Sequence, residues 1–515
     1  MNVTRRIFCA AALLTALAGF VPSARATVNY SISVAQPDRH RFHVRMTIPG
    51  VNDSVRVQMA AWDELYQIRD FAMRVIALRA ADLSGPVPTE KLDTETWLIK
   101  ANGTVAVEYD IEWNDPGPFS SQLNRDHAFL NFAMVLLYVP DRHTEDVRVQ
   151  FTDVPQNWNV AVELHADPAD ASQRTFVAPS FDALADAPAE LSAFDEFSFY
   201  AGGRSIRVVV HGKGWNRGDL TDWLTRIVNY ETTLMGGAPD GEYLFILHIG
   251  FGWGGGMEHS DCTAISVGSV VQLPDTAAHE FFHQWNVKRL RPQSLEPLDR
   301  THEMPTKGLW FAEGLTNTYA HYTLVRTGIF NPEQFYDVLA EEIATSESRP
   351  AHLWQSVEES SVDAWYEKYP MYTDGDFSVS YYDKGDVVGV MLDIVMRNAS
   401  NNRVGLDDLM RSMYENFAKK GRFYNDSADI RATAEDLLRK AGVPAQAADL
   451  SSFFSQYVSG AKEIPLADIL AEAGLQLHVG DTGTGPEYRI DEMSHPSDLQ
   501  RRIRDGLLHG TTSTP

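Results

Sequence analysis

The sequence His279-Glu280-Phe281-Phe282-His283 carries the strongest chemical signal in the chain. It stands in an amphipathic stretch that indicates a helix, and residues four apart lie one above the other on a helix, so the two imidazoles point toward one place. Two imidazole nitrogens on one rigid element provide half of a zinc site. Glu280 is displaced by about 100° around the helix axis, which places its carboxylate beside the metal, where a general base that activates water is needed. The motif therefore predicts a catalytic zinc helix.

A catalytic zinc site takes three protein ligands and keeps a fourth position open. The third candidate is Glu313, a single carboxylate in the apolar run of residues 309–315, which opens a second helical segment. A carboxylate in such surroundings needs a cationic partner. Glu296 and Glu303 compete by position, but both stand in a loop-like stretch, and a ligand on a rigid helix is held more accurately. We therefore expect Glu313 to complete a site for one zinc ion per chain.

Length and composition narrow the class of protein. The chain has 515 residues, of which 44% are hydrophobic and 22% charged, so it can bury a sizeable core and form about three domains. A net charge of -26 would repel a phosphate backbone, which argues against nucleic acid as a partner. Two cysteines, Cys9 and Cys262, cannot build a disulfide framework.

Residues 1–26 have the composition of a signal peptide. Arg5 and Arg6 precede an apolar run, and a small-x-small cleavage site ends at Ala26. The apolar run is shorter than the roughly 20 residues that span a membrane. The paired arginines also resemble the twin-arginine signal that exports folded proteins. We expect an exported protein, periplasmic or secreted, with no stable membrane anchor after cleavage.

Three regions follow the signal peptide. Residues 27–203 alternate hydrophobic and polar side chains, which predicts an N-terminal antiparallel β domain. Residues 204–465 contain longer amphipathic segments, at 220–234, 275–290, 309–326 and 386–397, which predict a mostly helical catalytic domain with a helical C-terminal lobe. Residues 466–515 are polar, and we expect a C-terminal tail that frays at its end. The predicted fold class is therefore α+β and multidomain.

The pattern around the two histidines extends well beyond five residues. Residues 279–292 read HEFFHQWNVKRLRP, and residues 310–314 read WFAEG. Together they resemble the glycyl aminopeptidase family, metallopeptidase family 61, in the zinc gluzincin clan that is related to aminopeptidase N and thermolysin. The resemblance implies a thermolysin-like catalytic domain in which the two histidines and Glu313 bind zinc and Glu280 is the catalytic base.

The resemblance also implies a class of substrate, and the chain differs from the family in one respect. It implies an aminopeptidase that acts on peptides with a free amino terminus and prefers a small first residue, Gly or Ala. Members of the family commonly carry a PDZ domain after the catalytic region. The chain has only about 40 residues after Leu475, so we expect no complete PDZ domain.

Residues 254–259 read GGGMEH and follow an apolar, strand-like segment. They resemble the exopeptidase motif of the clan, whose glutamate binds the free α-amine of the substrate. Glu258 is the candidate for that role, and Gly255 and Gly256 would let a peptide backbone approach as an added strand. A solvated carboxylate at a strand edge is the alternative explanation of Glu258.

The tetrahedral intermediate of peptide hydrolysis needs a hydrogen-bond donor for its oxyanion. Residues 381–385 read YYDKG and open a helix-like run. The pattern Tyr382-x-Lys384-Gly385 resembles the oxyanion tyrosine motif of the clan, so Tyr382 is the candidate donor, with Tyr381 as the alternative. A phenol suits this role because it donates a hydrogen bond without carrying charge at neutral pH.

Several features of the sequence have more than one explanation. Lys288, Arg289 and Arg291 fit ion pairs with the N-terminal domain, charge complementarity at a helix end, or contact with substrate. If Glu258 is not an amine anchor, the protein would be a zinc endopeptidase or another zinc hydrolase. A secreted peptide-binding protein with a structural zinc would need a fourth protein ligand, and His259 is the available candidate.

Overall fold

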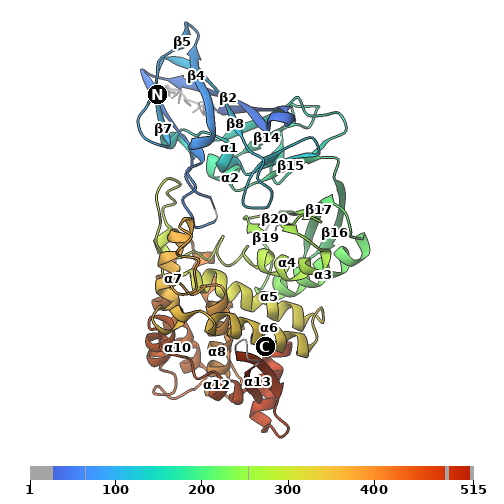
Figure 1. Ribbon diagram of the computed structural model, residues 1–515, viewed down its shortest axis with the longest axis vertical. Helices are drawn as coiled ribbons and strands as arrows, with labels where there is room; N and C mark the ends of the chain where they lie inside the picture. Colours follow the sequence, from blue (N-terminus) through green and yellow to red (C-terminus); the bar gives the residue numbers. More distant parts are fainter. Residues whose placement is uncertain (1–26, 64, 240, 253, 482–485, 511–515) are drawn as a thin grey trace, which may run out of the picture.

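The computed structural model describes residues 27–63, 65–239, 241–252, 254–481 and 486–510. Figure 1 shows a β-rich domain at the N-terminal end, a mixed sheet with helices in the middle, and a helical lobe at the C-terminal end. The predicted signal peptide, residues 1–26, lies outside the described residues. Within the part of the chain that the structure describes, no helix combines the length and the apolar character needed to cross a membrane. The predicted α+β class and the order of its two halves are confirmed.

The N-terminal domain consists of three sheets. Their strand orders are β13-β14-β11-β1-β2-β8-β4-β5, β12-β15-β10-β9 and β3-β7-β6. Pairings of the described strands are antiparallel, apart from the parallel pair β1–β11. The elements are β1 (Val28–Gln36), β2 (Arg41–Val51), β3 (Ser54–Gln58), β4 (Val75–Asp82), β5 (Gly85–Val87), β6 (Thr89–Lys91), β7 (Thr96–Lys100), β8 (Gly103–Glu112), β9 (Gln122–Leu123), β10 (His127–Leu130), α1 (Phe132–Val135), β11 (Val147–Thr152), β12 (Asn159–Val162), β13 (His165–Ala166), β14 (Thr175–Ala178), α2 (Phe181–Ala185) and β15 (Ala189–Ser192).

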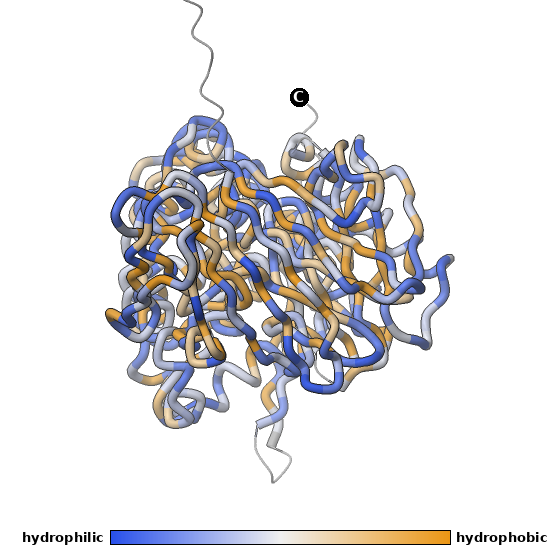
Figure 2. The backbone as a smooth tube through the Cα atoms, turned by 90° about the horizontal axis from the view of Figure 1, so that it is seen from above, coloured by the Kyte–Doolittle hydropathy of each residue, from blue (hydrophilic) through white to orange (hydrophobic). Residues whose placement is uncertain are grey.

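Alternation along the strands explains this domain. In β2 the side chains of Phe42, Val44 and Met46 are buried, while those of His43 and Arg45 between them are more exposed. Figure 2 shows the same alternation of hydrophobic and hydrophilic positions along the chain. The period of two matches the pleat of a strand with one face on a core, so the expectation of a β domain is confirmed.

A mixed five-stranded sheet follows, in the order β16-β17-β18-β20-β19. Strands β17, β18 and β20 are parallel, and β16 and β19 close the edges in antiparallel pairs. We expected the N-terminal domain to extend to residue 203, but β16 pairs along its whole length with β17, so this hairpin belongs to the second domain. The hairpin has the same alternation of hydrophobic and polar residues as the strands before it, so the sequence pattern does not show that a new sheet begins there. The elements are β16 (Asp195–Ala201), β17 (Arg204–Gly212), α3 (Arg217–Leu234), β18 (Tyr243–Ile249), β19 (Gly255–Glu258), β20 (Cys262–Val267) and α4 (Leu273–Phe282).

The helical lobe packs beneath this sheet around α5 and α8 (Figure 1). Helix α8 is buried along most of its length, and it contacts α5, α6 and α12. Its central place explains why its sequence is apolar over several turns. The helices are α5 (Leu315–Arg326), α6 (Pro332–Glu347), α7 (Val357–Asp363), α8 (Asp383–Ala399), α9 (Leu406–Asn416), α10 (Asp426–Lys440), α11 (Ser451–Phe453) and α12 (Leu466–Glu472).

The segment expected to be a polar tail is folded over most of its length. It forms α12, the hairpin of β21 (Leu475–Asp481) and β22 (Pro486–Glu492), and α13 (Asp498–His509). Ile503 and Leu507 of α13 are buried, and the Arg326 guanidinium donates hydrogen bonds to the carbonyls of Gly506 and Leu507. The expectation of a tail was wrong for this part because apolar residues four apart make one face of α13 a packing surface in a polar sequence.

Candidate active site

Helix α4 brings the two histidines together. The Nε2 atoms of His279 and His283 are 2.9 Å apart. His283 Nδ1 donates a hydrogen bond to the carbonyl of Asn286 at 2.7 Å, which leaves the lone pair on Nε2 directed at the shared point. We expected the helix to continue to residue 290, but α4 ends at Phe282 and the chain then turns. This turn is what places the Asn286 carbonyl against the ring of His283.

Glu313 reaches the same point from a different element. Its Oε2 lies 3.5 Å from His279 Nε2 and 3.3 Å from His283 Nε2. The residue belongs to a π-helical turn, Trp310–Gly314, that leads into α5, and such turns occur often at functional sites. The Asn286 side chain donates hydrogen bonds to the carbonyls of Phe311 and Ala312, so this amide fastens the turn to the end of α4. The three predicted metal ligands therefore converge.

Two glycines bring α8 against the turn that carries Glu313. A Cβ on Gly314 would lie 2.5 Å from Gly385 Cα, and a Cβ on Gly385 would lie 2.8 Å from the carbonyl oxygen of Trp310. Any side chain at either position would separate the two helices. The close crossing places Tyr382, at the start of α8, with its ring 6.2 Å from the ring of His279.

The adjacent tyrosines have different surroundings. Tyr382 lines the pocket above the histidines, whereas Tyr381 is buried and its hydroxyl is hydrogen-bonded to Glu367. Burial raises the pKa of Tyr382 well above its usual value, so its hydroxyl stays protonated and able to donate a hydrogen bond at neutral pH. The geometry favours Tyr382 over Tyr381 as the group that faces a substrate.

Strand β19 borders the site and carries the glycine-rich motif. Glu258 is buried, and one of its carboxylate oxygens lies within 4.8 Å of both a carboxylate oxygen of Glu280 and a ring nitrogen of His283. A Cβ on Gly256 would lie 2.3 Å from Glu280 Cγ, so the missing side chain makes room for Glu280. Gly255 has φ of +130° and packs against the Phe119 ring, where a Cβ would come within 3.0 Å. Packing against Phe119 and against Glu280 therefore explains why Gly255 and Gly256 carry no side chain.

The pocket above the histidines has a volume of about 260 Å³. The segment between β3 and β4 leaves the N-terminal domain and reaches the helical lobe (Figure 1). There Trp62 packs edge-on against Trp365 with ring centroids 5.0 Å apart. The pocket is lined by Leu65, Tyr66, Phe119, Gly255, Gly256, Met257, Glu258, Asp275, Thr276, His279, Glu280, His283, Glu313, Asn317 and Tyr382.

The N-terminal domain also contributes to this pocket, although the sequence analysis assigned none of its residues to the site. Leu65, Tyr66 and Phe119 come from loops about 160 to 220 residues before the histidines. The aromatic residues themselves are the only signal in the sequence, because aromatic side chains in loops are common at binding surfaces. Asn317 lies one helical turn after Glu313 and could have been found from that spacing.

The electrostatics of the site fit a cation. Burial alone would raise the pKa of Glu313, but His283 and His279 beside it lower this pKa to about 2. Burial raises the pKa of Glu280, and its Oε2 has no hydrogen-bond partner among the described residues. Two imidazole nitrogens and one carboxylate oxygen are the donor set of catalytic zinc. The donor types, their convergence and the adjacent unpartnered carboxylate oxygen all suit a zinc ion with a base at its side.

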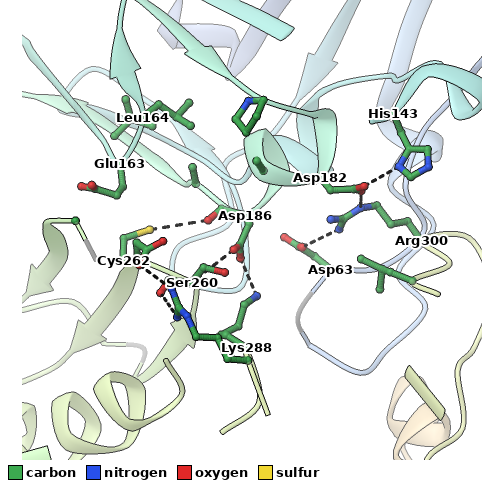
Figure 3. Close-up of a pocket in the computed structure, with 18 of the residues that line it drawn as sticks. Asp63, His143, Glu163, Leu164, Asp182, Asp186, Ser260, Cys262, Lys288 and Arg300 are labelled. Atoms are coloured by element: carbon green, nitrogen blue, oxygen red, sulfur yellow. Dashed lines mark hydrogen bonds and ion pairs between the residues drawn. The ribbon is translucent and has the colours of Figure 1, made fainter. Parts of the chain in front are cut away.

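A larger cavity, of about 1340 Å³, lies away from this chemistry along the interface between the two domains. Figure 3 shows Asp186 between Lys288 and Ser260, and Asp182 between His143 and Arg300. Lys288 Nζ is 2.7 Å from Asp186 Oδ1. The remaining basic residues of the signature pair within the second domain, Arg289 with Asp261 at 3.0 Å and Arg291 with Glu296 at 2.6 Å. The basic cluster therefore makes structural ion pairs.

Comparisons with known proteins agree with this geometry. The sequence model of the M61 glycyl aminopeptidase matches residues 272–388, and that of the peptidase M61 N-terminal domain matches residues 29–193. Together the two models cover more than half of the chain. The chain belongs to the M61 glycyl aminopeptidase family. This M61 protein is a metallopeptidase. The N-terminal match ends just before β16, in agreement with the domain boundary in the structure.

Solved structures support the same fold for this M61 peptidase. An aminopeptidase N family protein from Idiomarina loihiensis is 25% identical, with a TM-score of 0.82, over 88% of this chain and 79% of that protein. A variant of an M1 zinc metallopeptidase from Deinococcus radiodurans, bound to a Tyr-Ser-Ala substrate, is 14% identical, with a TM-score of 0.52, over 86% of this chain and 95% of that one. A search of curated proteins found no match.

Proposed function

We propose that the protein is a zinc aminopeptidase that removes a small first residue, Gly or Ala, from peptides with a free amino terminus. The observation that carries this proposal is the buried carboxylate of Glu258 beside the convergent His279, His283 and Glu313. A buried carboxylate at the end of a pocket is placed to pair with an ammonium group, and the α-amine of a peptide is the ammonium group that every first residue carries.

The size of the pocket favours a small first residue. Phe119 packs on Gly255 at one side, and Tyr66 and Tyr382 line the same space of about 260 Å³. Rigid aromatic walls exclude large side chains by overlap, whereas a glycine or alanine requires little room. The family to which the chain belongs is named for the release of glycine, which agrees with this inference.

The reaction we propose is hydrolysis by an activated water. His279, His283 and Glu313 would hold one zinc ion, which when bound supplies a Lewis acid and lowers the pKa of a water molecule to about 7. Glu280 lies beside these ligands and is placed to accept a proton from the attacking water and to return it to the departing amine. Tyr382 is placed to donate a hydrogen bond to the oxyanion. Glu258 would fix the amino terminus so that only the first peptide bond reaches Glu280.

A relative supports peptides as the substrate class. The Deinococcus enzyme of similar fold binds the tripeptide Tyr-Ser-Ala. We extend to the present chain only the chemical class, a peptide with a free amino terminus. We also propose that the chain is exported after cleavage at Ala26, which sequencing the amino terminus of the protein from a bacterial periplasm would test.

The experiment that tests the proposed function compares two peptides. The purified protein is given an Ala-led peptide and the same peptide with an acetylated amino terminus, and Glu280→Gln is the control for the chemistry. We expect cleavage of the free-amine peptide alone, lost in the variant. Equal cleavage of both peptides would identify an endopeptidase and remove the role of Glu258. Binding of either peptide without cleavage would make the protein a peptide-binding protein.

A further inference from the structure

A second cluster of histidines surrounds a carboxylate between the two domains, and none of its residues lines the pocket above His279 and His283. His127 of β10 and Glu190 of β15 come from the N-terminal domain, and His211 of β17 and His248 of β18 come from the mixed sheet. His211 and His248 are direct partners in the parallel pairing of β17 and β18. Four strand positions from two domains therefore meet at one place.

The distances in this cluster are those of a metal site. The Oε2 atom of Glu190 lies 3.3 Å from His127 Nδ1 and 3.2 Å from His248 Nε2, and His211 Nδ1 lies 3.9 Å from Glu190 Oε1. A tetrahedral zinc with bonds of about 2.0–2.1 Å holds its ligand atoms about 3.3–3.4 Å apart. The predicted active-site ligands are spaced similarly, because Glu313 lies 3.3 and 3.5 Å from its two histidines.

The hydrogen bonds of His127 decide which of its nitrogens faces the carboxylate. Its Nε2 donates to Gln122 Oε1 at 2.9 Å, and the amide nitrogen of Gln122 donates in turn to Asn114 at 3.1 Å. With Nε2 carrying the proton, Nδ1 of a neutral His127 directs its lone pair at Glu190. A lone pair facing a carboxylate is repulsive unless a cation lies between them. This is the arrangement in which a protein orients a histidine for a metal.

An ion pair without metal explains the cluster less well. Glu190 is fully buried, and its Oε1 has no hydrogen-bond partner among the described residues. A single carboxylate offsets only one imidazolium, yet His127 and His211 are stacked with ring centroids 4.4 Å apart and His248 lies edge-on to both. Charge-assisted hydrogen bonds are also shorter, about 2.7–2.9 Å, than the separations of 3.2 and 3.3 Å found here.

We propose that His127, Glu190 and His248 form a second metal site that takes a divalent transition metal of the zinc type, with the His211 ring stacked on His127 beside it. Imidazole with one carboxylate selects this class of ion over calcium or magnesium, which prefer oxygen ligands. These three residues are buried and belong to strands of two domains, so the role we infer for the ion is structural. Phe251 covers it, with its ring 5.4 Å from His211 and 6.2 Å from His248. The bound ion joins the N-terminal domain to the sheet that leads into β19.

The first test is the metal content of the full-length protein, which does not depend on the proposed function. After dialysis against a weak chelator, elemental analysis is expected to give about two transition-metal ions per chain. Glu190→Gln is expected to keep one ion, and the double variant His279→Ala, His283→Ala is also expected to keep one. His43→Gln is the matched control: His43 forms a half-buried pair with Asp110 at 2.7 Å in the same domain, and its loss should leave both ions.

A second measurement covers the case in which Glu190→Gln does not fold. Anomalous diffraction at the zinc edge from crystals of the unaltered protein is expected to show one peak at His279 and His283 and another among His127, Glu190 and His248. One ion per chain, with anomalous signal at the active site alone, would overturn the proposal. Retention of two ions by a folded Glu190→Gln variant would overturn it as well.

Discussion

Replacing Gly256 by alanine tests whether the glycine-rich strand positions the catalytic base. The new Cβ would lie 2.3 Å from Cγ and 2.4 Å from both Cδ and Oε1 of Glu280. Ordinary contacts between such atoms are about 3.5–4.0 Å, so the carboxylate must move by more than about 1 Å. The clash falls on the end of a side chain that can rotate, so the fold should survive while the base is displaced.

The expected loss of activity follows from this displacement. A shift of about 1 Å in a catalytic group costs about 100-fold in rate, which corresponds to about 2.7 kcal/mol in the activation free energy. We expect kcat of Gly256→Ala for an Ala-led peptide to fall by about 100-fold. The zinc content should not change, because the clash involves none of His279, His283 and Glu313. The assay is steady-state hydrolysis, with metal content and Tm measured on the same samples.

Gly254→Ala is the matched control in the same motif. Gly254 has no positive φ, and an added Cβ would meet nothing within 4 Å among the described residues. This variant should keep kcat within about threefold. If Gly256→Ala keeps its activity to the same extent, Glu280 is not held against β19 and the packing argument is refuted. A loss of zinc or a large fall in Tm in Gly256→Ala would refute it in a different way, because the damage would then reach the ligands or the fold.

Four further predictions concern the other groups of the site. Glu258→Gln should lower kcat/KM for a free-amine peptide by about 100-fold, about 2.7 kcal/mol, and leave an acetylated peptide unaffected, as measured by the ratio of the two rates. Tyr382→Phe should lower kcat by about 100- to 1000-fold, whereas Tyr381→Phe should change Tm more than kcat. Gly385→Ala, whose Cβ would meet a backbone carbonyl at 2.8 Å, should lower the free energy of unfolding by about 1–3 kcal/mol in urea titrations. Burial lowers the pKa of His283, but the nearby carboxylates of Glu313 and Glu258 outweigh burial and raise this pKa to about 10. Below that pH zinc must therefore displace a proton from His283. The affinity of the protein for zinc, measured by chelator competition, should rise about tenfold per pH unit between pH 6.5 and 9.

The convergence of His279, His283 and Glu313 could be predicted from the sequence because much of its geometry is local. The four-residue spacing of His279 and His283 is a property of any helix, and the apolar surroundings of Glu313 marked it as a carboxylate in need of a cation. The structure places these groups together with Glu280, Glu258 and Tyr382 around one pocket.

Features that depend on packing between distant segments could not be predicted. The chain entering β16 has the same alternation as the strands before it, so periodicity does not say which sheet it joins. Tyr66 and Phe119 enter the pocket through loops whose positions are set by the docking of two domains. The same is true of Glu190, whose four-residue cluster comes from four strands with no common spacing in the sequence.

The interface between the domains has a direct bearing on catalysis. Gly255 packs on Phe119, so the strand that carries Gly256 and Glu258 is held from one side by the N-terminal domain and from the other by α4. If the domains separated, β19 would lose the Phe119 contact and Glu258 would lose its fixed distance from Glu280. An ion at Glu190 would hold the domains together beside His248, which is level with Gly255 across the sheet, and would therefore support the position of Glu258 without touching the substrate.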